Sequence, residues 1–179
     1  MTESSAGYST VYVFGAGQIA LSLVVFAKEL DYTVVVVDDR EGFATKARFP
    51  RADEVKPGDL VSVANSIDFQ PTDCVVIITH EHQHDEAVLK ACLSRGKLPG
   101  YIGMIGNPKR IGFTFSRLMD QGLSREILDM VCAPIGLDIG AQSRAEIALS
   151  IMSEIVMHMH GKDRDEVRGM KRSDQRTKQ

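Results

Sequence analysis

Runs of apolar residues alternate with amphipathic stretches along most of this 179-residue chain. Three runs are rich in β-branched side chains and too continuously apolar to be half exposed, which is typical of parallel strands covered on both faces. A fourth run is interrupted by glycine, which indicates the close approach of a ligand or of a neighbouring element. The four predicted strands cover residues 10–14, 32–37, 74–79 and 101–106.

Amphipathic helices are predicted between and after these strands. Apolar residues recur there at three- and four-residue steps, so each helix has a wide apolar face for the sheet. Asn107 followed by Pro108 is a strong helix start, and Ser143 with Glu146 predicts a capping box for the last helix. The predicted helices cover residues 19–30, 87–95, 108–119 and 144–160. This alternation predicts an α/β fold with a doubly wound, mostly parallel sheet flanked by helices.

Shorter elements complete the predicted pattern. They are a helix over residues 42–49, an edge strand over 51–55, brief helices over 59–66 and 124–130, and a strand over 131–133.

The last long helix, predicted over residues 144–160, has an apolar stripe that is long enough to dock on the sheet or to be shared with a partner. A homodimer is therefore expected.

The first strand runs directly into a glycine turn, Gly15-Ala16-Gly17, and then into the first helix. In this G-x-G-x-x-A pattern, Gly15 makes the turn, Gly17 lets the backbone approach a ligand, and Ala20 lets the helix lie close to its strand. Such a turn directs free backbone N–H groups and the positive end of a helix dipole at one point, which favours a phosphate. The pattern predicts a Rossmann-like domain that binds a cofactor or nucleotide.

An acidic pair ends the second strand. Asp38 follows Gly17 by roughly twenty positions, the spacing at which a carboxylate meets the hydroxyl groups of a nucleotide ribose. The alternative is that Asp38 and Asp39 only begin the next turn or helix. Arg40 leaves the choice between NAD and NADP open, because an arginine accepts a 2′-phosphate that Asp38 would repel.

A polar cluster with the sequence HEHQHD follows the strand at 74–79. Its histidines and acids are ordinary metal ligands, but alternate positions of an extended segment point opposite ways, so a metal site would need a helical turn that joins His80 to His84. The position favours a ligand contact instead, because Thr79 and His80 lie at the carboxyl end of a strand, across the crevice from the glycine turn. A polar helix cap that includes His84 or Asp85 is the alternative.

Two further segments are predicted near the same crevice. Gly106 ends the strand at 101–106, and Lys109 and Arg110 follow it, able to meet an anion or to remain solvated. The glycine-rich apolar segment PIGLDIGA at 134–141 fits a loop that closes over the crevice. Asp138 within this loop either caps local backbone or contacts the ligand.

The composition narrows the choice of function. Apolar residues make up 44% and charged residues 25% of the chain, which is ordinary for one globular domain. The net charge of −3 argues against a nucleic-acid partner, which needs a concentrated basic face. We expect a flexible leader over residues 1–9, the cofactor-binding domain over 10–160, and a charged, disordered tail over 161–179.

The chain shows no sign of a membrane or secreted protein. No apolar run is long enough to span a bilayer, and the start of the chain lacks the features of a signal peptide, so a cytoplasmic location without membrane contact is expected. Cys74, Cys92 and Cys132 are far apart and include no C-x-x-C pair. Buried, inert thiols are therefore expected, rather than disulfides or a zinc site.

Taken together, these motifs resemble the C-terminal Rossmann-like domain of the XdhC/CoxI family, accessory proteins of molybdenum hydroxylases such as xanthine dehydrogenase. The resemblance covers about residues 10 to 158, and its last two stretches are specific to the family. The matching stretches are VFGAG at 13–17, VDDR at 37–40, TH at 79–80 with Asp85, YIGMIG at 101–106, and PIGLDIGA at 134–141 with EIA at 146–148.

The resemblance implies a protein that binds the molybdenum cofactor (molybdopterin), aids its sulfuration and helps to insert it into an apo-hydroxylase. Such a protein is more an accessory than a catalyst. The implied partners are a molybdenum hydroxylase client, a cysteine desulfurase, and a separate chain that supplies the family's N-terminal domain. A pterin with a phosphate tail suits the same helix N-terminus as a dinucleotide, so an NAD(P)-binding oxidoreductase and a nucleotide-sensing module stay open.

The candidate site follows from these arguments. No catalytic residue is assigned, although His80 is the one plausible proton-transfer group at a strand end, and no metal ligand is expected. The candidate cofactor-binding residues are Gly15, Ala16, Gly17, Gln18, Asp38, Asp39, Arg40, Thr79, His80, Gly106 and Asp138.

Overall fold

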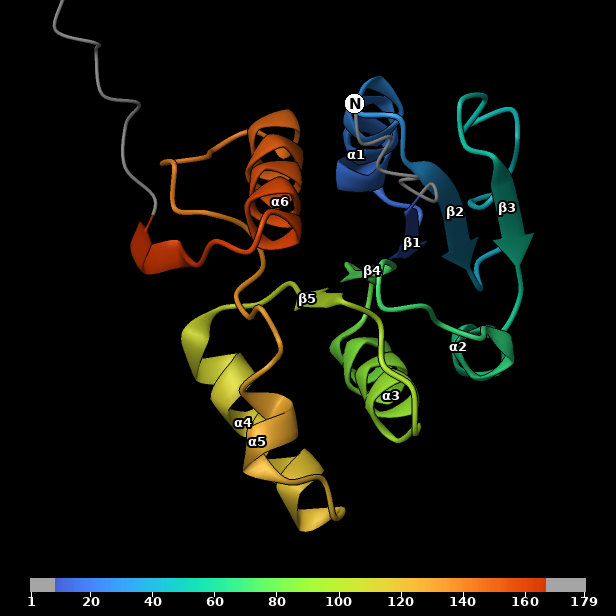
Figure 1. The fold of residues 1–179 in the computed structure, drawn as a ribbon. Helices are drawn as coiled ribbons and strands as arrows, with labels where there is room; N and C mark the ends of the chain where they lie inside the picture. The colour runs from blue at the N-terminus through green and yellow to red at the C-terminus, as the bar shows by residue number, and fades with distance from the viewer. Residues whose placement is uncertain (1–8, 167–179) are drawn as a thin grey trace, which may run out of the picture.

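A five-stranded, wholly parallel sheet forms the centre of the molecule in the computed structural model, which describes residues 9–166 (Figure 1). The strands are β1 (Thr10–Phe14), β2 (Thr33–Asp38), β3 (Glu54–Pro57), β4 (Cys74–Ile77) and β5 (Tyr101–Met104). The helices are α1 (Gln18–Glu29), α2 (Leu60–Ser66), α3 (His82–Leu93), α4 (Pro108–Asp120), α5 (Arg125–Leu128) and α6 (Arg144–Met159), followed by the 3₁₀ helix η1 (Arg164–Glu166). The prediction of a doubly wound, parallel α/β fold is confirmed.

The strand order β3-β2-β1-β4-β5 places the first strand in the middle of the sheet. The chain winds outward from β1 to β2 and β3, and then crosses to the other side to form β4 and β5. Val11 is therefore paired with Val34 on one side and with Cys74 on the other. After β1 the chain continues to one side of the sheet, and after β4 it continues to the other side. Open α/β sheets bind ligands in the crevice between the carboxyl ends of two such strands.

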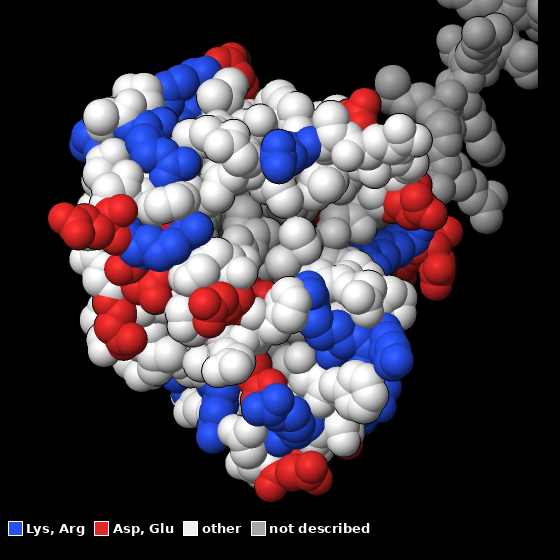
Figure 2. Space-filling model, turned by 180° about the vertical axis from the view of Figure 1, so that it is seen from behind, with Lys and Arg blue, Asp and Glu red and all other residues white. Residues whose placement is uncertain are grey.

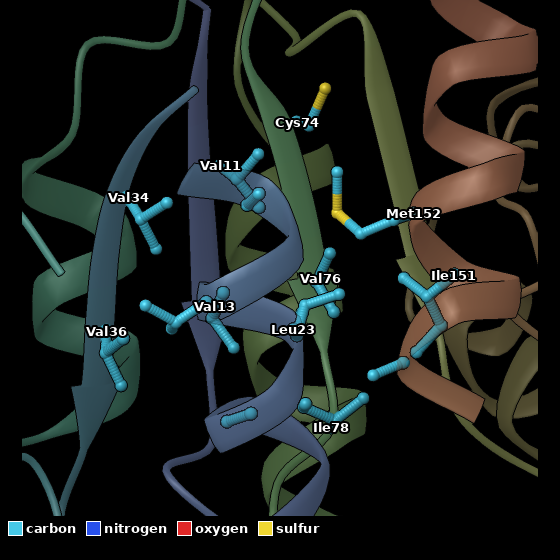
Figure 3. Close-up of a cluster of buried hydrophobic side chains, with 14 of the residues drawn as sticks. Val11, Val13, Leu23, Val34, Val36, Cys74, Val76, Ile78, Ile151 and Met152 are labelled. Atoms are coloured by element: carbon cyan, nitrogen blue, oxygen red, sulfur yellow. The ribbon is translucent and has the colours of Figure 1, made fainter. Parts of the chain in front are cut away.

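The side chains of each strand alternate between two buried cores. On one face, Val13, Val36 and Val76 pack with α1 and α6, whose Leu23 and Ile151 fill the space between helices and sheet (Figure 3). On the other face, Val37 and the neighbouring strand residues pack with α2, α3, α4 and α5. The continuous apolar runs thus form strands that are covered on both faces, as predicted.

The apolar stripe of α6 is used inside the molecule. Ala148, Ile151, Met152 and Ile155 are buried, and α6 lies beside α1 in Figures 1 and 3. Of the two uses expected for this stripe, docking within the domain is confirmed. The homodimer stays a prediction.

Three short elements differ from the sequence prediction. The edge strand expected over residues 51–55 is found three residues later, as β3 at Glu54–Pro57. Residues 42–49 form successive turns instead of a helix, because Gly42 has a φ of +75° and the side chains of Arg40 and Arg48 both fold onto the Phe43 ring. Residues 131–133 do not form a strand either. Cys132 bridges to Gly103 beside β5, but the regular ladder is broken at Pro134, which has no N–H group to donate, and Ile135 donates to the Met104 carbonyl oxygen instead.

The glycine inside β5 accommodates a neighbouring element. A Cβ atom at Gly103 would lie 2.7 Å from the Tyr101 hydroxyl and would overlap the side chain of Ile135. The close approach predicted from the sequence is therefore made by the segment after α5.

The two ends of the chain are described only in part. Of the leader expected over 1–9 and the disordered tail expected over 161–179, residues 1–8 and 167–179 lie outside the described residues. Residues 161–166 are described and include η1, so the folded part continues beyond residue 160. None of the described helices is both long enough and apolar enough to cross a bilayer. Figure 2 shows one face of the molecule, on which basic and acidic side chains are interspersed.

Candidate functional site

The glycine turn lies at the carboxyl end of β1, packed against the end of β4. Gly15 has a φ of +112°, and its N–H donates to the carbonyl oxygen of Val37 at 2.8 Å. A Cβ atom at this position would lie 2.6 Å from the Ile78 carbonyl carbon and 2.9 Å from Cα of Thr79, which is closer than real Cβ atoms come. The turn therefore needs glycine for two separate reasons, its backbone conformation and its contact with β4.

The N-terminus of α1 is open toward solvent. Gly17 is its N-cap, no side chain caps it, and no acidic residue lies in its first turn. Nothing lies within 4 Å of the place where a Gly17 Cβ would be, and Gln18 is exposed. The first N–H groups of the helix are thus left for a bound group, and the helix dipole favours an anion.

Asp38 is buried and already carries hydrogen bonds from within the chain. Its side chain is 1% exposed; Oδ2 accepts from the Ala16 N–H at 2.6 Å, and Oδ1 accepts from the Arg40 N–H at 2.9 Å. Arg40 also donates through Nε and NH2, at 2.9 and 2.8 Å. Burial alone would raise the pKa of Asp38, but the hydrogen bonds from Arg40 and Ala16 hold it below the usual value. Asp38 fastens the glycine turn to the end of β2, so a ribose would have to compete with these donors.

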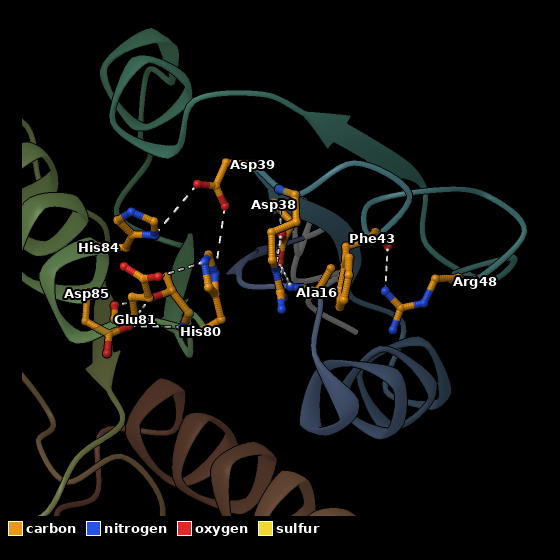
Figure 4. A network of polar contacts seen from close by, with 11 residues as sticks. Ala16, Asp38, Asp39, Phe43, Arg48, His80, Glu81, His84 and Asp85 are labelled. Carbon is orange, nitrogen blue, oxygen red and sulfur yellow. Dashed lines mark hydrogen bonds and ion pairs between the residues drawn. The ribbon is translucent and has the colours of Figure 1, made fainter.

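Arginine and aromatic side chains gather beyond β2. The guanidinium carbon of Arg40 lies 3.6 Å from the centroid of the Phe43 ring, and that of Arg48 lies 4.6 Å from it. Arg48 also donates to the carbonyl oxygen of Phe43 at 3.2 Å (Figure 4). Two cations therefore stack on one ring next to the turn that Asp38 holds; Arg40 is also paired with Asp38, so Arg48 carries the uncompensated positive charge.

The segment after β4 is held by Asp85. This carboxylate is 3% exposed, and its Oδ1 accepts from the Thr79 N–H at 3.0 Å and lies 2.7 Å from the Thr79 hydroxyl. Burial raises the pKa of Asp85, although the hydrogen bonds of Thr79 work in the opposite direction. Asp85 thus shapes the turn that carries His80, and His84 lies in the first turn of α3. His84 and Asp85 lie in the first turn of α3, as the helix-cap alternative expected, but no side chain caps this helix. The segment lies beside the glycine turn, since Gly15 packs against Ile78 and Thr79.

The remaining candidate residues lie farther from the glycine turn. Gly106 faces Ile111, whose Cγ1 lies 3.1 Å from the place of a Gly106 Cβ, and Arg110 contacts His82. Asp138 is exposed, and its Oδ1 accepts from the Gly140 N–H at 3.3 Å, which is the local capping interpretation. Its loop lines a hollow of about 620 Å³ together with Arg164, without any residue of the glycine turn. This hollow is therefore separate from the glycine turn, and closure of the loop over the crevice stays a prediction.

Sequence reasoning missed two features near these segments. Glu154 is fully buried in α6, where it accepts from the Tyr101 hydroxyl and the Gly136 N–H, both at 2.7 Å, and pairs with Arg164. An acid between Met152 and Ile155 in the apolar stripe was the available signal. The second feature is the proximity of His84 to Asp39, whose Oδ2 lies 3.7 Å from Nδ1 of His84. No local sequence pattern predicts this contact, because the two residues come from different halves of the sheet.

Comparisons with known proteins agree with this fold. The model of the family described as the XdhC Rossmann domain matches residues 11–155. A protein of Bacillus subtilis (strain 168), named as a probable subunit of xanthine dehydrogenase, is 31% identical over 144 residues, which is 80% of this chain and 41% of that protein. The uncharacterized protein YqeB of Escherichia coli (strain K12) is 25% identical over 146 residues, 80% of this chain and 26% of that protein.

This chain is also similar to a solved structure of a related protein. The crystal structure of a xanthine dehydrogenase from Bacillus halodurans superposes with a TM-score of 0.74 at 30% identity, and covers 89% of this chain and 45% of that chain. This chain spans less than half the length of each of these relatives. The glycine turn and the β4 end lie within the matched residues, while the ligand contacts of the candidate residues stay predictions. The chain belongs to the XdhC family, whose Rossmann domain it contains.

Proposed function

We propose that this domain binds the phosphate-bearing molybdenum cofactor and supports a molybdenum hydroxylase of the xanthine dehydrogenase type. The observation that carries the proposal is the uncapped N-terminus of α1, which faces open space at the carboxyl edge of the sheet in a chain of the XdhC family. The names of the Bacillus relatives support the association with xanthine dehydrogenase. Sulfuration of the cofactor, a cysteine desulfurase partner and a client hydroxylase are parts of the same proposal.

The phosphate of the cofactor would lie against the first turn of α1. A helix N-terminus carries a partial positive charge of about half an elementary charge and several N–H donors, which together bind phosphate. The absence of a side-chain cap and of an acid in the first turn of α1 leaves these groups free of internal competition. Arg48 supplies positive charge beyond β2 for a more distant anionic part of the ligand, whereas the charge of Arg40 is already compensated by Asp38.

A nicotinamide dinucleotide is the second candidate ligand. The arginine pair on Phe43 favours NADP, because such a surface suits a 2′-phosphate and the adenine beside it. Asp38 argues against an NAD-type ribose contact, since its oxygens accept from Ala16 and Arg40. An oxidoreductase or a nucleotide sensor would follow from this ligand.

The first test identifies the ligand without assuming it. The protein is purified without oxygen from cells that make molybdenum cofactor, then denatured, and the released small molecule is analysed by mass spectrometry. We expect a molybdopterin or its oxidised, fluorescent product. Release of NADP, NAD or an adenine nucleotide instead would reject the molybdenum cofactor and leave the family relationship as one of fold.

A matched pair of variants tests where the ligand binds. Gly17→Asp places a carboxylate at the phosphate, and at about 4–8 Å in a dielectric of about 20 this costs about 2–4 kcal/mol. Bound ligand should fall at least roughly thirtyfold, because each 1.4 kcal/mol is a factor of ten. Gly17→Asn has the same shape without the charge, so it should retain most of the affinity that Gly17→Asp loses. Equal losses in both variants would assign the effect to bulk, and no loss in either would move the site elsewhere.

A further inference from the structure

Three side chains of types that bind metal ions lie close together at the carboxyl edge of the sheet. Asp39 follows β2, His80 follows β4, and His84 lies in the first turn of α3 (Figure 4). One ligand atom from each of them lies within 4.8 Å of the other two. The Asp39 carboxylate is 3.8 Å from Nδ1 of His80 and 3.7 Å from Nδ1 of His84, and the two imidazole rings are 4.9 Å apart at their centroids.

These separations suit a shared ion better than direct hydrogen bonds. A nitrogen and an oxygen 3.7 or 3.8 Å apart are too distant for a hydrogen bond, which needs about 2.7–3.2 Å. Two ligands that each lie about 2.0–2.2 Å from one tetrahedral zinc ion are separated by roughly 3.3–3.6 Å. The two carboxylate–imidazole separations, 3.7 and 3.8 Å, are only slightly longer than this, so a metal ion needs small side-chain adjustments.

The His84 ring provides a second, independent observation. Its Nδ1 atom is buried and has no hydrogen-bond partner among the described residues. A buried polar atom without a partner costs free energy, so such an atom indicates a missing ligand, ion or water. This nitrogen is the same atom that lies 3.7 Å from Asp39, within the three-residue cluster.

The surroundings of His80 position its ring. Asp85 fastens the Thr79 backbone, which sets the turn that carries His80. Nε2 of His80 faces the Glu81 carboxylate at 3.8 Å, on the opposite side of the ring from Asp39. A metal-binding histidine commonly turns its second nitrogen toward a carboxylate, which orients the ring and raises its basicity.

We propose that Asp39, His80 and His84 bind one divalent transition-metal ion, with Zn²⁺ as the ion that the donor set fits. Two imidazoles and one carboxylate leave at least one coordination position for water or for a ligand, as in catalytic zinc sites and in two-histidine, one-carboxylate iron sites. The site adjoins the glycine turn, because Gly15 packs against the Ile78–Thr79 backbone immediately before His80. This inference goes beyond the proposed function and does not depend on it.

The test uses the metal alone. The untagged full chain is stripped of metal with a chelator and titrated with Co²⁺, read by its visible d–d absorption, and with Zn²⁺, read by calorimetry. We expect one equivalent of each ion to bind. His84→Ala and Asp39→Asn should each weaken binding at least roughly tenfold, since even a residue behind a metal ligand commonly contributes 10–100-fold.

His82→Ala is the matched control. His82 lies on the same helix, two positions before His84, and is exposed outside the cluster, so its loss should change affinity by less than about twofold. Circular dichroism and thermal unfolding of each variant separate a lost ligand from a lost fold. The proposal is overturned if the unaltered chain binds no Co²⁺ saturably, which would leave a water molecule as the partner of His84, or if folded His84→Ala binds as tightly as His82→Ala. Either result leaves the cofactor experiment at Gly17 unaffected.

Discussion

Replacement of Gly15 by alanine should destabilise the domain more than any other single methyl group added to the glycine turn. At this residue φ is +112°, and the new Cβ would lie 2.6 Å from the Ile78 carbonyl carbon and 2.9 Å from Cα of Thr79. All three of the nearest atoms belong to the backbone at the end of β4, which pairs with β1 and β5 and has no room to move. The perturbation therefore combines an unfavourable φ with an overlap that no side-chain rotation relieves.

The magnitude follows from these two contributions. A left-handed backbone costs a non-glycine residue about 1–2 kcal/mol, and forcing an extra methyl group into packed structure costs about 1–3 kcal/mol. Their sum is about 2–5 kcal/mol of unfolding free energy. For a domain of this size, each kcal/mol lowers Tm by about 2–4 °C, so a fall of about 4–20 °C is expected.

Two other glycines provide matched controls for Gly15→Ala. Gly42 has a φ of +75° and nothing within 4 Å of its added Cβ, so Gly42→Ala measures the conformational cost without the overlap. Gly17 has a φ of −78° and the same open space, so Gly17→Ala should leave stability within about 1 kcal/mol of the unaltered chain.

Urea unfolding followed by circular dichroism measures the unfolding free energy of all three variants. We expect the loss of stability to decrease from Gly15→Ala to Gly42→Ala to Gly17→Ala. If Gly15→Ala unfolds at the same urea concentration as Gly42→Ala, the contact between the turn and β4 does not have the packing inferred from these distances. Equal losses at Gly15 and Gly17 would refute the reasoning altogether.

Three further predictions concern the buried polar groups and the thiols. Tyr101→Phe should cost about 1–3 kcal/mol of unfolding free energy, because it removes a hydrogen-bond donor from the fully buried Glu154. Tyr32→Phe is the control: the Tyr32 hydroxyl has no hydrogen-bond partner among the described residues, so this change should cost less than about 0.5 kcal/mol. Because the pKa of Asp38 is lower in the folded chain than its ordinary value of 3.8, its contribution to stability is present above pH 3.8 and is lost as pH falls below that value through the lower folded pKa. Urea midpoints measured between about pH 5 and pH 2 should fall less steeply for Asp38→Asn, and identical slopes would contradict the assignment. Burial raises the pKa of Cys74 and Cys92 to about 12 and that of Cys132 to about 11, so iodoacetamide at pH 8 should label the native chain slowly and the urea-unfolded chain at all three thiols; rapid native labelling, seen by mass spectrometry, would show that these cysteines are accessible.

Local sequence patterns determined most of the fold. Continuous β-branched runs predicted β1, β2 and β4 because a strand buried on both faces needs apolar residues at every position. The starts of α4 and α6 were equally readable, since Asn107 and Ser143 cap helix N–H groups within three residues of themselves. Gly15 was identified as the turn residue for the same reason: its backbone requirement is set by the chain immediately around it.

Only the tertiary structure decided how the polar side chains at the sheet edge are used. The sequence placed Asp38 at the right distance from Gly17 for a ribose, but the fold brings the Ala16 N–H and the Arg40 guanidinium to its carboxylate first. The turns at 42–49 depend on side-chain contacts with Phe43, which compete with local helix propensity. Asp39 and His84 meet because β2 and β4 both flank β1 and end at the same edge of the sheet. Periodicity along the chain carries information about neighbours in sequence, whereas such encounters depend on strand order, which places residues from distant segments within one contact distance.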